Sequence, residues 1–241
     1  MLKKFTQKLQ TNQNSKTKIK VAVLFSGGKD SVYTTYLMLK RNFEVILISM
    51  VPKKYSLMFH YPNIKWCKLQ AKAAGIKHYL FKINKKEEID GLKNALKKLK
   101  VDAIAAGATY SNYQKNRIEK IAKELNLKTF FPLWHKKPSF LKKMLKEMEV
   151  YITAVAAEGL DKTYLGKRFF AEDVDKLLKL NPPINVFLEG GEGETFVADA
   201  PFFQYKIKIL KWRKYFSKTS GFAYIKKAIL EIKTKDKKIK N

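Results

Sequence analysis

Between Lys20 and Phe131, short apolar runs alternate with longer segments in which apolar positions recur every three or four residues. The short runs are rich in β-branched residues, which favours strands that are buried on both faces. These predicted strands are 21–25, 44–51, 77–83, 102–108 and 128–131. The predicted helices are 31–41, 64–74, 87–99 and 113–125. Regular alternation of this kind predicts an α/β fold, a parallel sheet with helices on both faces.

After Pro132 this alternation stops, and the pattern predicts a smaller C-terminal α+β lobe. Helical segments at 140–148 and 172–180 flank an extended segment at 150–155. A turn-rich stretch between two apolar strands follows at 186–203, and the segments 205–212 and 222–229 alternate as an antiparallel pair does. We therefore expect a basic N-terminal arm at 1–15, a first domain at 16–131, an α+β domain at 132–233 and a basic tail at 234–241.

The sequence Ser26-Gly27-Gly28-Lys29-Asp30-Ser31 joins the first predicted strand to the first predicted helix. In an open parallel sheet this turn lies at the carboxyl edge, where the free N–H groups of the helix attract anions. Glycines let the backbone approach a phosphate closely, two serines add hydroxyl donors, and Lys29 adds a positive charge. The loop therefore predicts phosphate binding, although it matches neither the Walker A nor the GxGxxG pattern. Asp30 would either help to hold Mg²⁺ or cap the helix.

Composition and charge indicate which classes of protein this chain can belong to. The chain is 46% hydrophobic, which is enough for a sizeable core, and it has no apolar run long enough to span a membrane. Its first residues are polar and basic, so we expect a cytoplasmic protein without a secretory signal. The net charge of +29 is concentrated at the ends, with +6 over residues 1–20 and +11 over residues 205–241. Such termini would contact RNA, or they are simply solvated surface charge in a Lys-rich chain.

Cys67 is the single cysteine, which excludes an internal disulfide and a CxxC metal site. It would pair with His60 as a nucleophile or fill a small space in the core. Its place in the apolar pattern of 64–74 favours the core.

Three further stretches carry polar side chains in conspicuous patterns. Within 107–125, Gln114 and Arg117 are three residues apart, and we expect them on one helical face, opposite the apolar stripe of Ile118 and Ile121. The stretch 157–167 contains a polar turn with Glu158 and Asp161. The stretch 189–203 places three glutamates in six residues, which repel one another unless a cation lies nearby. Taken alone, the Gln114 and Arg117 pattern is more typical of a solvated helical face, and the three glutamates are as typical of a surface loop as of a cation site.

Together and in this order, the loop and the three stretches resemble the diphthine–ammonia ligase family of the PP-loop ATP pyrophosphatase superfamily. The resemblance runs from Val21 to about Tyr205, and the EGGE-x-ET and YQ-x-x-RIE segments are its most specific parts. Met58–His60 and Pro132–Trp134 also lie where the family has similar residues. Gly193 departs from the family, in which we expect an aromatic residue at this position.

The resemblance implies a PP-loop (HUP, or adenine nucleotide alpha hydrolase-like) fold and an AMP-forming ligase. Such an enzyme amidates the diphthine carboxylate on translation elongation factor 2 through an acyl-adenylate, with ammonium as the nitrogen donor and ATP and Mg²⁺ as cofactors. The nucleotide-binding residues it implies are Ser26, Gly27, Gly28, Lys29, Asp30, Ser31 and Gly107. The implied substrate-binding residues are Tyr113, Gln114, Arg117, Glu158, Asp161, Gly190, Gly191 and Thr195. One of Glu189, Glu192 and Glu194 would act as general base, or the three would hold the trimethylammonium group.

Two other functions stay open at this point. A PP-loop enzyme that modifies tRNA would suit the positive charge, and a non-catalytic nucleotide-binding or RNA-binding module would suit the fold. Neither explains the glutamates at 189–194.

Overall fold

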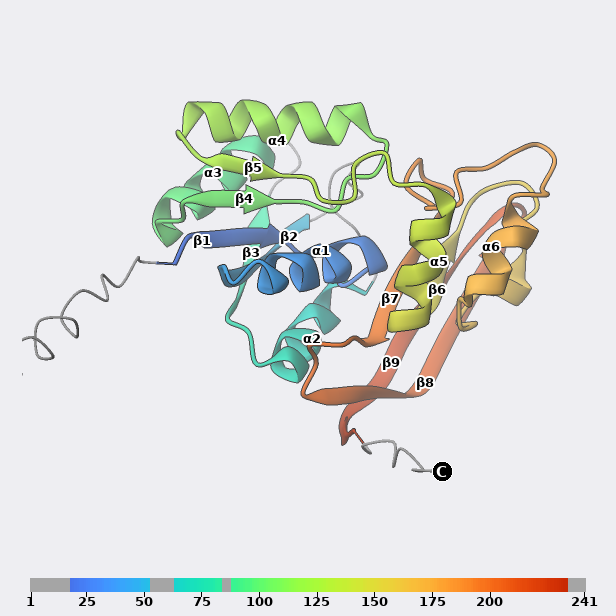
Figure 1. Cartoon of the computed structure of the whole chain (residues 1–241). Coiled ribbons are helices and arrows are strands. Elements are labelled where there is room, and N and C mark those ends of the chain that lie inside the picture. Colours follow the sequence, from blue (N-terminus) through green and yellow to red (C-terminus); the bar gives the residue numbers. More distant parts are fainter. Residues whose placement is uncertain (1–17, 53–62, 84–87, 234–241) are drawn as a thin grey trace, which may run out of the picture.

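The computed structural model describes residues 18–52, 63–83 and 88–233. Its first half is built on a five-stranded parallel sheet with the strand order β3-β2-β1-β4-β5 (Figure 1). The strands are β1 (Lys20–Leu24), β2 (Glu44–Pro52), β3 (His78–Ile83), β4 (Ala103–Ala105) and β5 (Lys128–Phe130). All four neighbouring pairs run parallel, so the predicted parallel sheet is confirmed.

Helices cover both faces of this sheet, as the sequence predicts. They are α1 (Lys29–Lys40), α2 (Cys67–Ala74), which follows the 3₁₀ turn η1 (Ile64–Trp66), α3 (Glu88–Leu99) and α4 (Asn112–Glu124). Successive strand residues point to opposite faces. Val21 and Val23 pack in one core with α1 and α2, whereas Ala22 packs in the other with α3 and α4. The continuous apolar runs in the sequence are therefore explained by burial on both sides.

The C-terminal lobe is a four-stranded antiparallel sheet with the order β7-β6-β9-β8 and two helices. Its elements are α5 (Pro138–Glu147), β6 (Glu149–Val155), η3 (Lys162–Tyr164), α6 (Ala171–Leu177), β7 (Gly193–Asp199), β8 (Tyr205–Ser217) and β9 (Ser220–Ile232). The predicted tail pair is confirmed as the long β8–β9 hairpin. One expected strand is absent, because Val186–Leu188 form a buried turn. Among the described residues, no helix is both long and apolar enough to cross a lipid bilayer.

The two halves pack against each other through α1 and α2, which lie between the two sheets (Figure 1). The Tyr33 hydroxyl on α1 donates to Glu147 at 2.9 Å, and the Tyr36 ring stacks on Phe202. The same apolar core continues from Val21 to Ile225. The C-terminal lobe is therefore in direct contact with the elements that carry the predicted phosphate loop.

Two side chains from the first half also cover part of an open strand edge in the second. Strand β9 pairs with β6 only at Gly221 and Phe222, so its later residues have no strand partner on that side. The Asn63 amide donates to Ala223 O at 2.9 Å and accepts from Ile225 N at 3.0 Å. The Trp66 indole donates to the Ile225 carbonyl at 3.0 Å. The turn before α2 thus continues the hydrogen-bond ladder of the antiparallel sheet.

Candidate functional site

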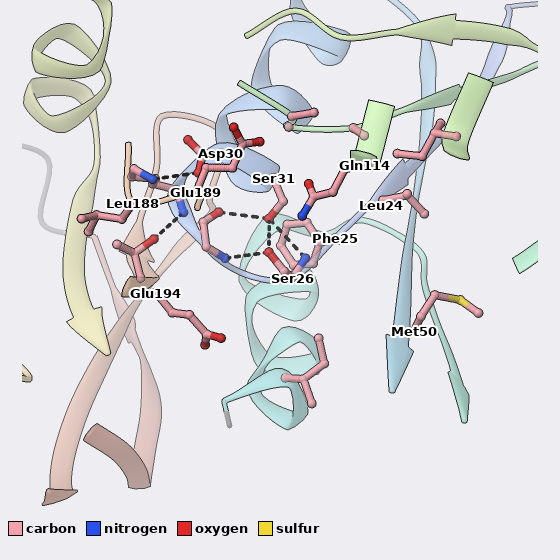
Figure 2. Close-up of a pocket in the computed structure, with 18 of the residues that line it drawn as sticks. Leu24, Phe25, Ser26, Asp30, Ser31, Met50, Gln114, Leu188, Glu189 and Glu194 are labelled. Atoms are coloured by element: carbon pink, nitrogen blue, oxygen red, sulfur yellow. Dashed lines mark hydrogen bonds and ion pairs between the residues drawn. The ribbon is translucent and has the colours of Figure 1, made fainter. Parts of the chain in front are cut away.

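A cavity opens at the carboxyl ends of β1 and β4, where the strand order of the parallel sheet reverses (Figure 2). Ligands of open α/β sheets bind at this switch point. Three segments meet there: the loop after β1, the loop after β4, and the segment around β7 from the other lobe. The lining residues are Leu24, Phe25, Ser26, Gly28, Lys29, Asp30, Ser31, Ile48, Met50, Ile64, Ala106, Gly107, Ala108, Gln114, Ile118, Leu188, Glu189, Gly193, Glu194 and Thr195.

The loop after β1 takes a conformation that requires glycine at its first turn. Gly27 has a φ of +78°, and a Cβ there would lie 2.2 Å from Oε1 of Gln70. Gln70 is fully buried, and its Nε2 donates to Gly27 O and to Val197 O, both at 2.8 Å. The Val197 N–H also donates to Gly27 O, at 3.0 Å. Hydrogen bonds from α2 and from β7 of the C-terminal lobe therefore hold the loop in place.

The two serines of the loop face each other across its turn. Their hydroxyl oxygens are 3.2 Å apart, and the Ser26 N–H donates to Ser31 Oγ at the same distance. Ser31 Oγ donates to Gly28 O at 3.0 Å, and the Gly28 N–H donates to Ser26 Oγ at 3.4 Å (Figure 2). The two hydroxyls thus lie at the start of α1, where the N–H groups of a helix attract anions.

Lys29 is buried, with a 2% exposed fraction, and its ammonium group already has partners. It contacts the Asp30 carboxylate at 2.7 Å and donates to the carbonyl of Phe187. The Lys29 N–H donates to Thr195 Oγ1 at 3.0 Å. Lys29 therefore ties the start of α1 to the C-terminal lobe, a contact that the sequence pattern did not predict.

Gly107 brings the loop after β4 against the start of α1. A Cβ at this position would lie 2.7 to 2.9 Å from atoms of Asp30, so only glycine allows this approach. Both residues line the cavity.

Glu189 binds the loop after β4 from the other lobe. Its carboxylate accepts from the Thr109 N–H at 2.7 Å, from Thr109 Oγ1 at 2.6 Å and from the Ser111 N–H at 3.0 Å. The Tyr110 N–H is a fourth donor. Ser111 is the N-cap of α4, so the carboxylate lies at the positive end of that helix. A carboxylate that accepts four hydrogen bonds positions this loop.

The three glutamates of the 189–194 segment do not form one cluster around a common point. Glu194 lines the cavity from β7, beside the phosphate loop (Figure 2). The Glu192 carboxylate folds back toward Gly190 and does not line the cavity, and one of its oxygens is buried without a hydrogen-bond partner. Of the three, Glu194 is the best placed to act on a ligand in the cavity.

One wall of the cavity consists of apolar side chains and a single amide, that of Gln114. Leu24, Phe25, Ile48 and Met50 line it from the parallel sheet, with Gln114 and Ile118 from α4. Because Gln114 and Ile118 are four residues apart, they share one helical face. The expectation that Gln114 lies opposite Ile118 is therefore wrong. Arg117 points elsewhere, with its guanidinium 4.4 Å from the centre of the Tyr113 ring, which is 47% exposed.

Several other predicted substrate residues lie outside this cavity. Glu158 is exposed, and Asp161 caps η3 by accepting from the Thr163 N–H and hydroxyl. Gly190 and Gly191 form an exposed turn, and Gly191 has a φ of +99°. Met58–His60 lie outside the described residues.

Gly193 lies in β7 and has a packing reason to be glycine. It is paired with Val155 of β6, and a Cβ there would lie 2.5 Å from the Ala154 carbonyl oxygen. An aromatic side chain at this position would require a different strand geometry.

Cys67 is fully buried at the start of α2, as expected for a core residue. Burial raises the pKa of its thiol to about 12, so the thiolate needed for nucleophilic attack is not formed near neutral pH. Among residues 18–52, 63–83 and 88–233, no group of three or more His, Cys, Asp or Glu side chains has a metal-binding arrangement.

Comparison with known proteins identifies the family of the chain. Residues 19–129 match the diphthamide synthase N-terminal domain, and residues 137–231 match the diphthamide synthase C-terminal domain. The diphthine–ammonia ligase of Bos taurus is 31% identical over 220 residues, which cover 78% of this chain and 82% of that protein. The chain belongs to the diphthine–ammonia ligase family. The family expected from the sequence is thus confirmed.

Other members of the diphthine–ammonia ligase family differ in length. The Mus musculus ligase is 30% identical over 222 residues, which cover 79% of this chain and 83% of the mouse protein. The Schizosaccharomyces pombe ligase is 32% identical over 220 residues, but the match covers only 36% of that longer protein. This chain therefore spans about a third of the fission yeast relative.

Sequence reasoning missed the residues that join the two halves at the site, namely Gln70, Thr109 and Phe187. Gln70 lies on the buried face of the helix predicted at 64–74, and a glutamine at an apolar position was a usable signal. Thr109 and the Phe187 carbonyl carry no local signal, since their roles depend on contacts between distant segments.

Proposed function

We propose that this chain is an AMP-forming diphthine–ammonia ligase that amidates the diphthine carboxylate of translation elongation factor 2 in the cytoplasm. The observation that carries the proposal is the cavity in which the phosphate loop, an apolar wall and Glu194 meet. The names of the relatives supply the substrate, diphthine, and the nitrogen donor, ammonia. With Gly107 beside Asp30, the two loops after β1 and β4 provide the nucleotide side of this site.

ATP would bind with its phosphates at the loop after β1. The Ser26 and Ser31 hydroxyls and the N–H groups at the start of α1 would hold the β and γ phosphates. The adenine ring would lie along the apolar wall, where Phe25 and Met50 offer contact and Gln114 offers a hydrogen bond. Glu194 lines the same cavity from β7 of the C-terminal lobe.

The reaction needs ATP because a carboxylate is a poor acyl donor. A diphthine carboxylate oxygen attacks the α phosphorus, the bond between the α and β phosphates breaks, and pyrophosphate leaves with that electron pair. Ammonia then attacks the acyl carbon, and the bond to AMP breaks. Glu194 would accept the proton that ammonium must lose before its nitrogen can attack.

Asp30, whose carboxylate contacts the Lys29 ammonium, would be the protein ligand of Mg²⁺ at this site. Asp30 lines the cavity next to the loop, and Mg²⁺ in nucleotide sites is commonly held by one or two carboxylates together with phosphate oxygens. A bound Mg²⁺ would offset the charge of the leaving pyrophosphate.

The test uses purified protein with ATP, Mg²⁺, ammonium and elongation factor 2 that bears diphthine. The intact mass of the factor and the nucleotide products are followed together. We expect conversion of the carboxylate to the amide, with AMP and pyrophosphate instead of ADP. Formation of AMP only when tRNA is present would move the proposal to tRNA modification, and no amide with either substrate would overturn it.

The Glu194→Gln variant tests the role of the general base. It should lower kcat for amide formation by about 10²- to 10⁴-fold while ATP affinity, measured by calorimetry, stays within about twofold. Glu172→Gln is the matched control, because Glu172 is exposed on α6 and lies outside the cavity, and it should leave both values unchanged. Full activity of Glu194→Gln would remove Glu194 from the chemistry.

A further inference from the structure

A second depression lies on the outer face of the β8–β9 hairpin, next to the turn that precedes α2. It is lined by Ile64, Lys65, Arg213, Tyr215, Tyr224, Ile225 and Lys226. Arg213 is paired directly with Tyr224 across the hairpin, and Tyr215 follows two residues after Arg213 on the same face. Tyr215 is 65% exposed, the highest exposure among the tyrosines of the described residues with large exposed side chains. We call this depression the hairpin groove.

The hairpin groove carries three cations and no acidic lining residue. Within the described part of the chain, Lys65, Arg213 and Lys226 have no carboxylate within ion-pair distance, and all three are exposed. The opposite end of the same hairpin differs in this respect. There Lys206 contacts Glu149 at 2.7 Å and Lys208 contacts Glu231 at 2.9 Å. The positive charge of the hairpin is therefore compensated at one end and uncompensated at the groove.

The groove is next to the reaction cavity. Ile64 lines both depressions, so a single side chain forms part of the wall of each. A macromolecule that presents one modified side chain to Glu194 must rest its surrounding surface close to the mouth of the cavity. The groove is a surface of this kind, and its tyrosines can pack against apolar or cationic side chains as well as accept or donate hydrogen bonds.

We propose that the hairpin groove docks an acidic segment of the protein that carries the diphthine side chain. This proposal rests on the proposed function. Carboxylates of the segment pair with Arg213, Lys226 and Lys65, while Tyr215 and Tyr224 provide the contact area between them. The groove acts before the chemical step and adds nothing to it, so its loss weakens binding of the protein substrate and leaves ATP binding unchanged.

The test compares the double variant Arg213→Glu/Lys226→Glu with the control Lys98→Glu/Lys128→Glu. Both pairs change the net charge equally, and the control lysines are exposed on α3 and β5, away from the groove. Amide formation is measured against the concentration of diphthine-bearing elongation factor 2 at low and at physiological salt. The groove variant should raise KM for the factor at least about tenfold, with kcat and KM for ATP within about twofold of the wild type. The control should change KM for the factor less than about threefold.

A third variant, Arg213→Lys/Lys226→Arg, keeps the charges and should restore KM to within about threefold of the wild type. Thermal unfolding of each variant confirms that it is folded. Equal KM values in the groove and control variants would overturn the docking proposal while leaving the ligase function intact. Loss of labelled tRNA binding in the groove variant with an unchanged KM for the factor would also overturn it, in favour of RNA. Wild-type protein that forms no amide would overturn the proposed function itself.

Discussion

His78 is a titratable residue that is linked through Ser49 to Phe25, the residue before the phosphate loop. Its Nε2 lies 2.8 Å from Ser49 Oγ, and the Ser49 hydroxyl donates to the Phe25 carbonyl at 2.6 Å. Because the single hydroxyl proton is used in that bond, Ser49 accepts from the imidazole, whose Nε2 therefore carries a proton. Burial, with a smaller contribution from Lys68, lowers the pKa of His78 to about 4. The neutral form is thus the one that fits the fold.

This pKa predicts how stability depends on pH. In the unfolded chain His78 takes up a proton near pH 6.5, whereas in the folded chain it does so only near pH 4. The unfolded state therefore binds more protons in this window, and the free energy of unfolding falls as the pH drops from 6.5 toward 4. The contribution of His78 is at most about 3 kcal/mol. Urea unfolding at several pH values should show a shallower slope for His78→Gln than for the wild type.

Gln keeps a donor for Ser49 and cannot be protonated, so it separates the charge from the hydrogen bond. Equal slopes for the two proteins between pH 6.5 and 4 would show that His78 does not control acid stability.

At the scale of elements, the phosphate loop is held by two segments that are distant from it in sequence, α2 and β7. Gln70 on α2 binds the carbonyls of Gly27 and Val197, and β7 binds the loop through Val197 and Thr195. The loop conformation therefore depends on α2 and β7 as well as on its own glycines.

The Gln70→Leu variant should be destabilised by about 2–4 kcal/mol, because it leaves the Val197 carbonyl buried without its donor and removes one donor from Gly27. It should also weaken ATP binding, since the loop loses its support from α2. Urea unfolding and calorimetry with ATP measure the two effects. The control Gln204→Leu changes an exposed glutamine next to Gly75 and should stay within about 0.5 kcal/mol of the wild type. A Gln70→Leu variant as stable as this control would show that the two hydrogen bonds contribute little.

The elements themselves could be predicted because their signals are local. Helical periodicity and short apolar runs depend on neighbours within a few residues, and the predicted elements occur in the structure in the expected order. The strand predicted at Val186–Leu188 is absent from the structure, because a short apolar run is compatible with any buried conformation. At the site, the loop after β1 was predictable from its glycines. The contacts of Lys29 with Thr195 and of Glu189 with Thr109 were not, since they join residues 166 and 80 positions apart.

For the whole molecule, these contacts mean that the proposed nucleotide site is shared between the two halves. Thr195, Val197, Phe187 and Glu189 all belong to the C-terminal lobe, yet each binds a loop of the parallel-sheet half. The domain boundary at residue 132 stays a prediction, and residues of the proposed site lie on both sides of it.

A fragment of residues 1–135 should therefore bind ATP at least about tenfold more weakly than the full chain. It should also expose Cys67, which is fully buried in the intact protein, to a thiol reagent at pH 8. Calorimetry with ATP and the rate of thiol modification measure these effects. Co-expression with residues 136–241 is the control and should restore both values. A separate fragment with full ATP affinity and a protected thiol would show that the first half is complete without the second.

The hydrogen bonds of Asn63 and Trp66 to β9 have a consequence for self-association. A strand edge with open N–H and C=O groups is a template on which a second chain can add its own strand. By occupying the Ala223 and Ile225 positions, the Asn63 amide and the Trp66 indole keep this part of the edge from recruiting another copy. The turn that brings α2 to the phosphate loop thus also helps to keep the protein from aggregating through its antiparallel sheet.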